Sequence, residues 1–171
     1  MPRAVHERAR QPGSSQGGVV YSVVLTCHSW ARWAALLLGA CATVNAFRVR
    51  GDAALPPRGR RWDSLFMLAV DLQALFGFLL YFGLSPFTRD AMSHAVVAMR
   101  DPRLRFFLFT HVAAMMIAMA AVRVGRVMAT SDRSAVARGT GRYVCFGIAL
   151  LVMMAGVPWP GLTYGRPLFR W

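Results

Sequence analysis

Four long apolar runs constrain this chain more than any other feature of its sequence. They extend over about residues 21–47, 64–84, 104–122 and 143–157. A helix needs about 20 mostly apolar residues to cross the hydrocarbon core of a bilayer. Arginines fall between the runs, as they do in loops that flank membrane spans. The sequence therefore predicts an all-α integral membrane protein whose four transmembrane helices form an up-down bundle with short loops.

The charge of the chain must be judged against this apolar pattern. The net charge is +13, and all 20 basic residues are arginines. A nucleic-acid-binding surface gathers its basic residues on one face or element, whereas these arginines are dispersed between apolar runs. Only 16% of the residues are charged, compared with about 25% in a soluble domain. We therefore expect the lipid bilayer to be the main partner and expect no nucleic acid.

The chain divides into two parts of different composition. Residues 1–18 hold three arginines followed by a run of Gly, Ser and Gln. Such a segment cannot bury a core of its own. We expect a basic tail that is disordered or held by a partner protein, and a transmembrane domain over residues 19–171.

The arginines also predict an orientation. The loop after the first run and the loop after the third run hold five arginines each. Dense positive charge in short loops is typical of the cytoplasmic side of a membrane. We therefore expect loops 1 and 3 in the cytoplasm and both termini in the periplasm of a bacterial inner membrane.

Two histidines lie at matching depths inside the runs. His28 and His111 are each about seven residues into the first and third runs, so both lie about 10 Å below the same face. Those two helices are diagonal in an up-down bundle, with axes about 12–14 Å apart, which we expect to be too wide for the imidazoles to meet. The gap suits haem b, whose iron takes two histidines as axial ligands. A hydrogen bond from each histidine to a carbonyl group is the other interpretation.

A second pair of ionisable residues lies near mid-membrane. Arg32 in the first run and Asp71 in the second differ in depth by only a few ångströms, at about 1.5 Å per residue. Buried charges in a membrane usually pair with one another. The sequence thus predicts an Arg32–Asp71 ion pair with Gln73 nearby, and Arg32, one turn after His28, could also face a haem propionate.

The loop between the second and third runs contains a third histidine, His94. Residues 90–99 have apolar side chains between flanking arginines, which favours a short helix lying on the membrane surface. His94 in this helix is either a solvated surface residue or a third ligand. No nucleophile motif, phosphate loop or zinc-protease motif is present, so we expect no enzyme activity beyond electron transfer.

Several segments resemble a family of small bacterial four-helix membrane proteins that are sometimes labelled cytochrome b-like. The matching segments are residues 27–33, 71–73, 77–82, 99–106, 124–126, 156–160 and 165–170. The resemblance implies a four-helix membrane fold over nearly all of residues 20–170. Family members tend to have an acidic residue before the histidine of the third helix, where this chain has Thr110.

Two functions remain open at this point. The first is a single bis-His haem b protein that carries electrons between quinol and a partner, with His28 and His111 as ligands. The second is a haem-free accessory subunit of a larger respiratory or photosynthetic membrane complex. The first requires that both imidazoles point into a common cavity, whereas the second allows them to be buried separately.

Overall fold

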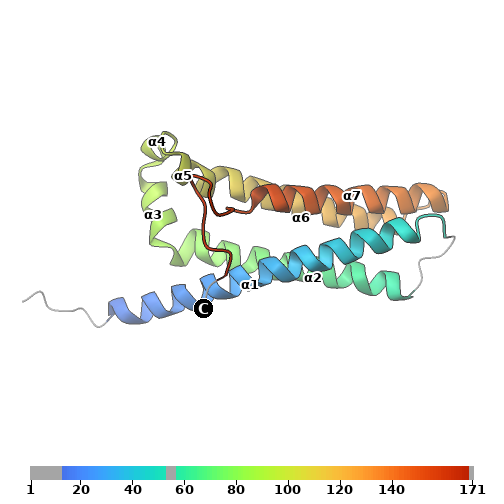
Figure 1. Ribbon diagram of the computed structural model, residues 1–171, viewed down its shortest axis with the longest axis horizontal. Coiled ribbons are helices and arrows are strands. Elements are labelled where there is room, and N and C mark those ends of the chain that lie inside the picture. The colour runs from blue at the N-terminus through green and yellow to red at the C-terminus, as the bar shows by residue number, and fades with distance from the viewer. Residues whose placement is uncertain (1–12, 53–56, 170–171) are drawn as a thin grey trace, which may run out of the picture.

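The computed structural model describes residues 13–52 and 57–169, and all of the regular structure within them is helical (Figure 1). Two helical stretches include a wider, π-helical turn, labelled η. The elements in chain order are α1 (Gly13–Arg48), α2 (Pro57–Phe78), η1 (Leu79–Leu84), α3 (Pro86–Ser93), α4 (Ala95–Ala98), α5 (Pro102–Arg105), η2 (Phe106–Thr110), α6 (His111–Ala129) and α7 (Ala135–Gly156).

Four of the helical stretches are long and apolar enough to cross a membrane, which indicates a multi-pass membrane protein. These stretches are Gly17–Arg48, Arg61–Leu84, Pro102–Ala129 and Ala135–Gly156. Each contains most of one predicted run, and the helices extend beyond the runs. α1 already begins at Gly13, so residues 13–18 of the expected tail are helical, and residues 1–12 lie outside the described part of the chain.

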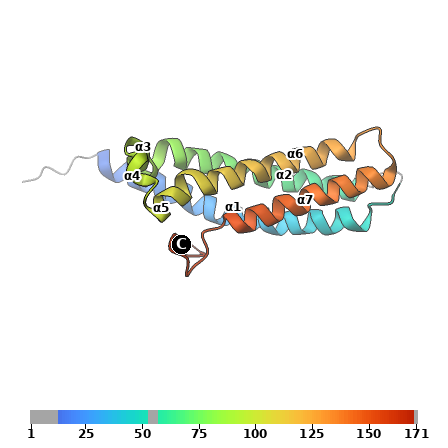
Figure 2. The ribbon, with the colours of Figure 1, turned by 90° about the horizontal axis from the view of Figure 1, so that it is seen from above.

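The long helices lie side by side along the molecule. α1 packs against α2 and α7, and α6 packs against α7 and α2. Figure 2 shows α2 and α6 along one side and α1 and α7 along the other. α1 and α6, which carry the two histidines, therefore face each other across the centre.

On α7 and on α2, a stripe of residues with alternating spacings of three and four faces the centre of the bundle, and these stripes explain the packing. On α7 the buried residues are Gly139, Arg142, Phe146, Ala149, Met153 and Gly156. On α2 the same spacing joins Asp63, Phe66, Val70, Gln73 and Gly77. This 3–4 spacing is typical of helices that pack at a small crossing angle. It places an ion pair, an aromatic pair and a histidine site in successive layers.

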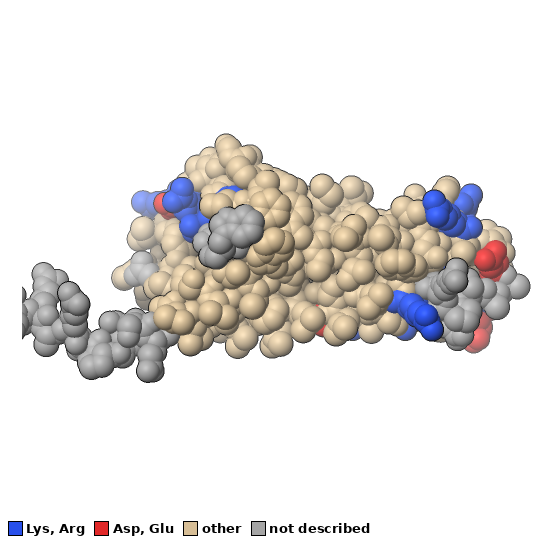
Figure 3. All heavy atoms as spheres, turned by 60° about the horizontal axis from the view of Figure 1, so that its bottom comes forward, with Lys and Arg blue, Asp and Glu red and all other residues tan. Residues whose placement is uncertain are grey.

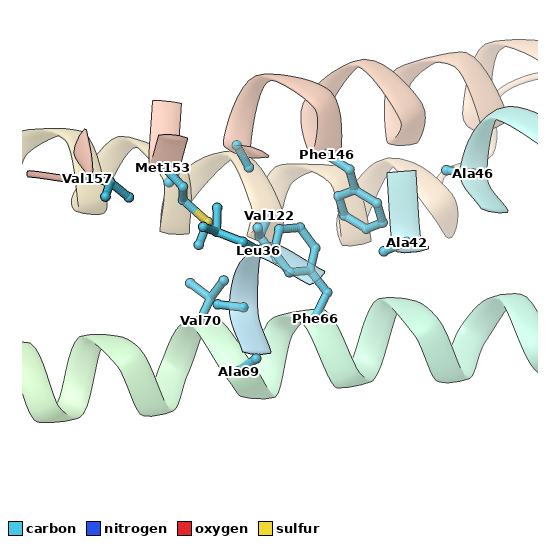
Figure 4. Packing of buried hydrophobic residues seen from close by; sticks show 13 residues of the cluster. Leu36, Ala42, Ala46, Phe66, Ala69, Val70, Val122, Phe146, Met153 and Val157 are labelled. Atoms are coloured by element: carbon cyan, nitrogen blue, oxygen red, sulfur yellow. The ribbon is translucent and has the colours of Figure 1, made fainter. Parts of the chain in front are cut away.

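The aromatic layer forms the centre of the core. Phe66 and Phe146 are fully buried, and their rings meet edge to face with centroids 5.6 Å apart (Figure 4). Gly125 on α6 leaves room for Phe146, since a Cβ at this glycine would lie 2.7 Å from the ring. Side chains from all four long helices thus meet around one aromatic pair.

The charged layer lies at the end of the bundle nearer the α1–α2 and α6–α7 loops. The fully buried Asp63 accepts a hydrogen bond from Nη2 of Arg142 at 2.9 Å. Its second oxygen lies 2.9 Å from Nε of Arg142 and 3.6 Å from Nη1 of Arg126. α6 and α7 extend to Ala129 and from Ala135, so Arg123, Arg126, Arg138 and Arg142 are helical rather than loop residues. The predicted loop 3 is therefore much shorter than expected.

The other end is built from short elements. Ser85 caps α3, and Asp101 caps α5 by accepting from the backbone N–H groups of Arg103 and Leu104, as residues at helix N-termini typically do. The expected single surface helix over residues 90–99 is divided into α3 and α4 at His94, whose side chain is exposed. On the face drawn in Figure 3, arginines gather mainly at the two ends, with a broad uncharged region between them.

Replacing Asp63 with Asn is expected to destabilise the fold strongly. Breaking a buried ion pair leaves an uncompensated charge, here on Arg142, at a cost of about 3–5 kcal/mol. The measurement is the midpoint of thermal unfolding of the purified protein in a mild detergent. Asp132→Asn, in the exposed loop between α6 and α7, is the matched control and should leave the midpoint unchanged. An equal midpoint for both variants would contradict a stabilising role for the pair.

Candidate ligand-binding cavity

A cavity lies between the helices at the end opposite the Asp63–Arg142 pair, and both intramembrane histidines line it. The ring centroids of His28 and His111 are 6.3 Å apart, with 72° between the ring planes. The expectation that these imidazoles are too far apart to meet is therefore wrong. That expectation rested only on the distance between the helix axes. Both side chains point inward from diagonal helices, and this brings the two rings together.

The end of α7 holds His111 in position. Nδ1 of His111 is 2.7 Å from the carbonyl oxygen of Gly156, one of the last carbonyl groups of α7, which lack partners within the helix. A Cβ at Gly156 would lie 2.5 Å from Met115 and 3.1 Å from Ala114, so a glycine is needed for α7 to approach α6 this closely. The π-helical turn η2 directly precedes His111, and such turns are frequent at functional sites.

The side chain of His28 is held in position by α2. The side-chain amide of Gln73 donates to Nε2 of His28 at 3.2 Å. Gly77, one turn later, packs beside the ring, since a Cβ there would lie 3.4 Å from Cε1 of His28, which is ordinary van der Waals contact. Gly156 contacts His111 in a different way, through its carbonyl oxygen.

Polar atoms remain unsatisfied in this cavity. Among the described residues, Nδ1 of His28 and Oε1 of Gln73 are buried without a hydrogen-bond partner. A buried polar atom without a partner costs about 1–3 kcal/mol, and native structures contain few of them. Both atoms lie in the part of the cavity that holds the two imidazoles.

The predicted Arg32–Asp71 ion pair is not formed. Nη2 of Arg32 instead donates to the carbonyl oxygen of Leu168 at 2.6 Å, and Asp71 pairs with Arg123 at 2.7 Å. Depth along a helix does not determine which way a side chain points. Asp71 is two residues from the buried Gln73, which places the two side chains on nearly opposite sides of α2, because successive helical residues are about 100° apart.

The segment after α7 closes the end of the cavity. The indole N–H of Trp33 donates to the carbonyl oxygen of Leu168 at 3.1 Å, alongside Arg32. The ring of Tyr164 stacks on Phe106 with centroids 3.8 Å apart. Arg166 lies over the ring of Phe107 at 5.2 Å and also lines the cavity. Arg32 and Arg166 therefore bring two cationic side chains to the cavity that contains the histidines.

Most of the remaining lining is aromatic or apolar, and Ser29, Ser85 and Thr88 are its polar members. It includes Tyr21, Leu25, Phe78, Tyr81, Phe87, Phe107, Met115 and Met153. His94 is not among the lining residues, and Cys27, next to His28 in the chain, is exposed on the outside of α1. Within the described residues no group of three or more His, Cys, Asp or Glu side chains could hold a metal ion. The cavity lining contributes two side chains of these types, His28 and His111.

The sequence indicated four of the residues involved and missed the others. His28, His111, Arg32 and Gln73 were singled out because they are polar within apolar runs. Gly77, Gly156 and Arg166 were not, although Gly77 continues the 3–4 stripe through Phe66, Val70 and Gln73 and could have been found by that spacing. Nothing in the local sequence indicates Arg166, which reaches the cavity only because the final segment folds back over the helix ends.

Comparisons with protein-family models, with curated proteins and with solved structures find no match to this chain. The resemblance to four-helix membrane proteins labelled cytochrome b-like therefore remains a prediction. The function must be argued from the cavity itself.

Replacing Arg32 with Leu is expected to loosen the closing segment, residues 157–169. Hydrogen bonds from charged groups contribute about 1.5–3 kcal/mol, so local opening should become about tenfold more frequent. The measurement is amide hydrogen exchange of this segment in detergent micelles. Arg100→Leu, at an exposed position between α4 and α5, is the control. Unchanged exchange in Arg32→Leu would show that Trp33 and the aromatic stacking hold the segment without Arg32.

Proposed function

We propose that this protein is an electron carrier of a bacterial inner membrane that binds a single haem b between His28 and His111. The observation that carries the proposal is the pairing of these imidazoles inside one cavity, 6.3 Å apart between ring centroids and supplied by diagonal helices. When bound, the haem iron would supply a reversible one-electron change. An up-down arrangement of the four helices places both histidines at one level in the membrane.

The distance between the rings is compatible with shared coordination. An imidazole nitrogen lies about 1.15 Å from its ring centre for ring bonds of about 1.35 Å. With a metal–nitrogen bond of about 2 Å, as for zinc and imidazole, two imidazoles that hold one metal would have ring centroids up to about 6.3 Å apart. The observed separation of 6.3 Å agrees with this value.

The hydrogen bonds of the two rings also support ligation. A histidine that binds a metal usually donates its other ring N–H to a carbonyl or carboxylate, which orients the ring and makes the ligating nitrogen more basic. His111 has such a bond from Nδ1 to Gly156, and this leaves Nε2 with its lone pair. Gln73 orients His28, and turning its amide to accept from Nε2–H would leave Nδ1 of His28 as the ligating nitrogen.

The two arginines of the cavity fit the anionic side of a haem. Haem b carries two propionate groups, and guanidinium groups bind carboxylates through paired hydrogen bonds. Arg32 and Arg166 both line the cavity, on the side closed by the final segment. Their role is to neutralise the propionates, while the aromatic lining excludes water.

The proposed orientation places this cavity near the periplasmic face. With loops 1 and 3 in the cytoplasm, the Asp63–Arg142 pair lies toward the cytoplasm and the histidines toward the periplasm. A quinol dissolved in the bilayer is the proposed electron donor, because the lining that surrounds the histidines is mostly apolar. The alternative of a haem-free accessory subunit has one observation in its favour. The Asp71–Arg123 ion pair lies on the outer surface of the helices, where another protein could contact it.

The test is a reduced-minus-oxidised visible spectrum of the detergent-purified protein after addition of haem. The wild-type protein and His94→Ala are expected to bind about one haem per chain and to show the same sharp α-band of a bis-His b-type haem, because His94 lies outside the cavity. His28→Ala and His111→Ala are expected to lose this band, since each removes one of the two axial ligands.

Size-exclusion chromatography of every variant separates loss of haem from loss of folding. His111→Met offers a second readout, because replacing one histidine with methionine should raise the reduction potential of a haem that is still bound. Well-folded wild-type protein without an α-band, or His111→Ala with an unchanged spectrum, would rule out the assignment of the ligands.

A further inference from the structure

The ion pair between Asp71 and Arg123 occupies an unusual place. Both residues belong to stretches long enough to span a membrane, Arg61–Leu84 and Pro102–Ala129. Asp71 lies near the middle of its stretch, about 15 Å from the Arg61 end at 1.5 Å per residue. Yet the side chains are 49% exposed for Arg123 and 37% exposed for Asp71. The charges therefore lie on the outer surface of the helices at the depth of the hydrocarbon core.

Such a position is costly if lipid surrounds it. Charged side chains within spans almost always face the interior of a bundle or a water-filled cavity. Arg123 and Asp71 share one hydrogen bond of 2.7 Å, from Nη2 to Oδ1. The guanidinium has five N–H donors and the carboxylate about four acceptor sites, so one such bond leaves most of them to be satisfied. Protein on the outer side of this pair would supply these partners.

The surrounding surface is apolar and belongs to two neighbouring helices. Leu68 and Leu75 lie one turn before and after Asp71 on α2 and are 54% and 52% exposed. On α6, Met116 and Val127 flank Arg123 on the same side, with the exposed small residue Ala120 between them. α2 and α6 lie along one side of the molecule (Figure 2). We call this surface the α2–α6 face.

We infer that the α2–α6 face is the interface of a homodimer, in which Asp71 of each copy pairs with Arg123 of the other. A two-fold interface must be self-complementary, because the same surface meets itself. The α2–α6 face meets this condition, since it presents one acidic and one basic side chain next to each other on adjacent helices. Rotation about a two-fold axis along the membrane normal keeps every residue at its depth and brings Asp71 opposite Arg123 of the second copy.

The product of this rotation is a ring of four alternating charges. Each carboxylate then accepts from two guanidinium groups, and each guanidinium donates to two carboxylates. Helices within a bilayer are joined mainly by interhelical hydrogen bonds and by close van der Waals packing, which small residues at the interface allow. Ala120 next to Arg123 allows the backbones to approach. The inference does not depend on haem, because neither Asp71 nor Arg123 lines the cavity.

The decisive experiment uses charge reversal in two copies that carry different affinity tags. Asp71→Arg alone and Arg123→Asp alone each place two like charges on the face, and each should reduce self-association at least tenfold in a pull-down from detergent-solubilised membranes. Coexpressed, the two variants have complementary faces and should recover wild-type association with each other. The rescue also restores accumulation if either variant is unstable alone.

Two further variants test the same interface. Asp71→Arg combined with Arg123→Asp in one chain exchanges the charges and should dimerise like the wild-type protein. Asp132→Arg changes charge away from the face and should have no effect. Native mass spectrometry from lipid nanodiscs should show the wild-type dimer. A wild-type protein that is monomeric or bound only to a different subunit would overturn the inference, as would single reversals that still self-associate or fail to rescue each other.

Discussion

Polar groups inside a bilayer need partners within protein, because the hydrocarbon core offers none. The helices satisfy their own backbone groups, so this constraint acts mainly on the few polar side chains of the spans. Asp63 satisfies it with Arg142, and His111 with a carbonyl group at the end of α7. His28 satisfies it only in part, since its Nδ1 is buried without a partner among the described residues. The unpaired atoms of His28 and Gln73 mark the cavity where we propose a ligand, and the exposed Asp71–Arg123 pair marks the face where we propose a second copy.

The two ends of the molecule meet this constraint in different ways. The layer around Asp63 is closed, because its carboxylate is bound by Arg142 and approached by Arg126. The layer around the histidines is open toward a cavity, which both imidazoles line. A closed ionic layer stabilises the bundle without requiring a ligand. An open layer lined by imidazoles and arginines costs stability unless something binds there, which is the physical reason to place the function at that end.

The sequence predicted the depth of residues in the membrane, because depth depends on position along a helix. It failed to predict the direction of side chains, because direction depends on rotation about the helix axis. Apolar runs located the four spans, and counting residues brought His28 and His111 to the same level. The Arg32–Asp71 pair failed because counting says nothing about the direction of a side chain. The 3–4 spacing of Phe66, Val70, Gln73 and Gly77 would have shown that Asp71 lies off the buried stripe. A hydrogen bond to a carbonyl group was one of the two interpretations of each histidine, and His111 forms one with Gly156. Which carbonyl His111 and Arg32 would reach could not be predicted, because that depends on where α7 ends and how the chain continues after it.

α2 connects the two proposed sites. Its inward stripe carries Gln73 and Gly77 against His28, and its outward side carries Asp71 two residues from Gln73. A rigid helix cannot turn one of these side chains without moving the other, because both are attached to the same turn. Rotation of α2 that brought Asp71 closer to a second copy would move Gln73 away from its present place beside His28. The proposed dimer and the proposed haem site would therefore constrain the same rotational setting of α2.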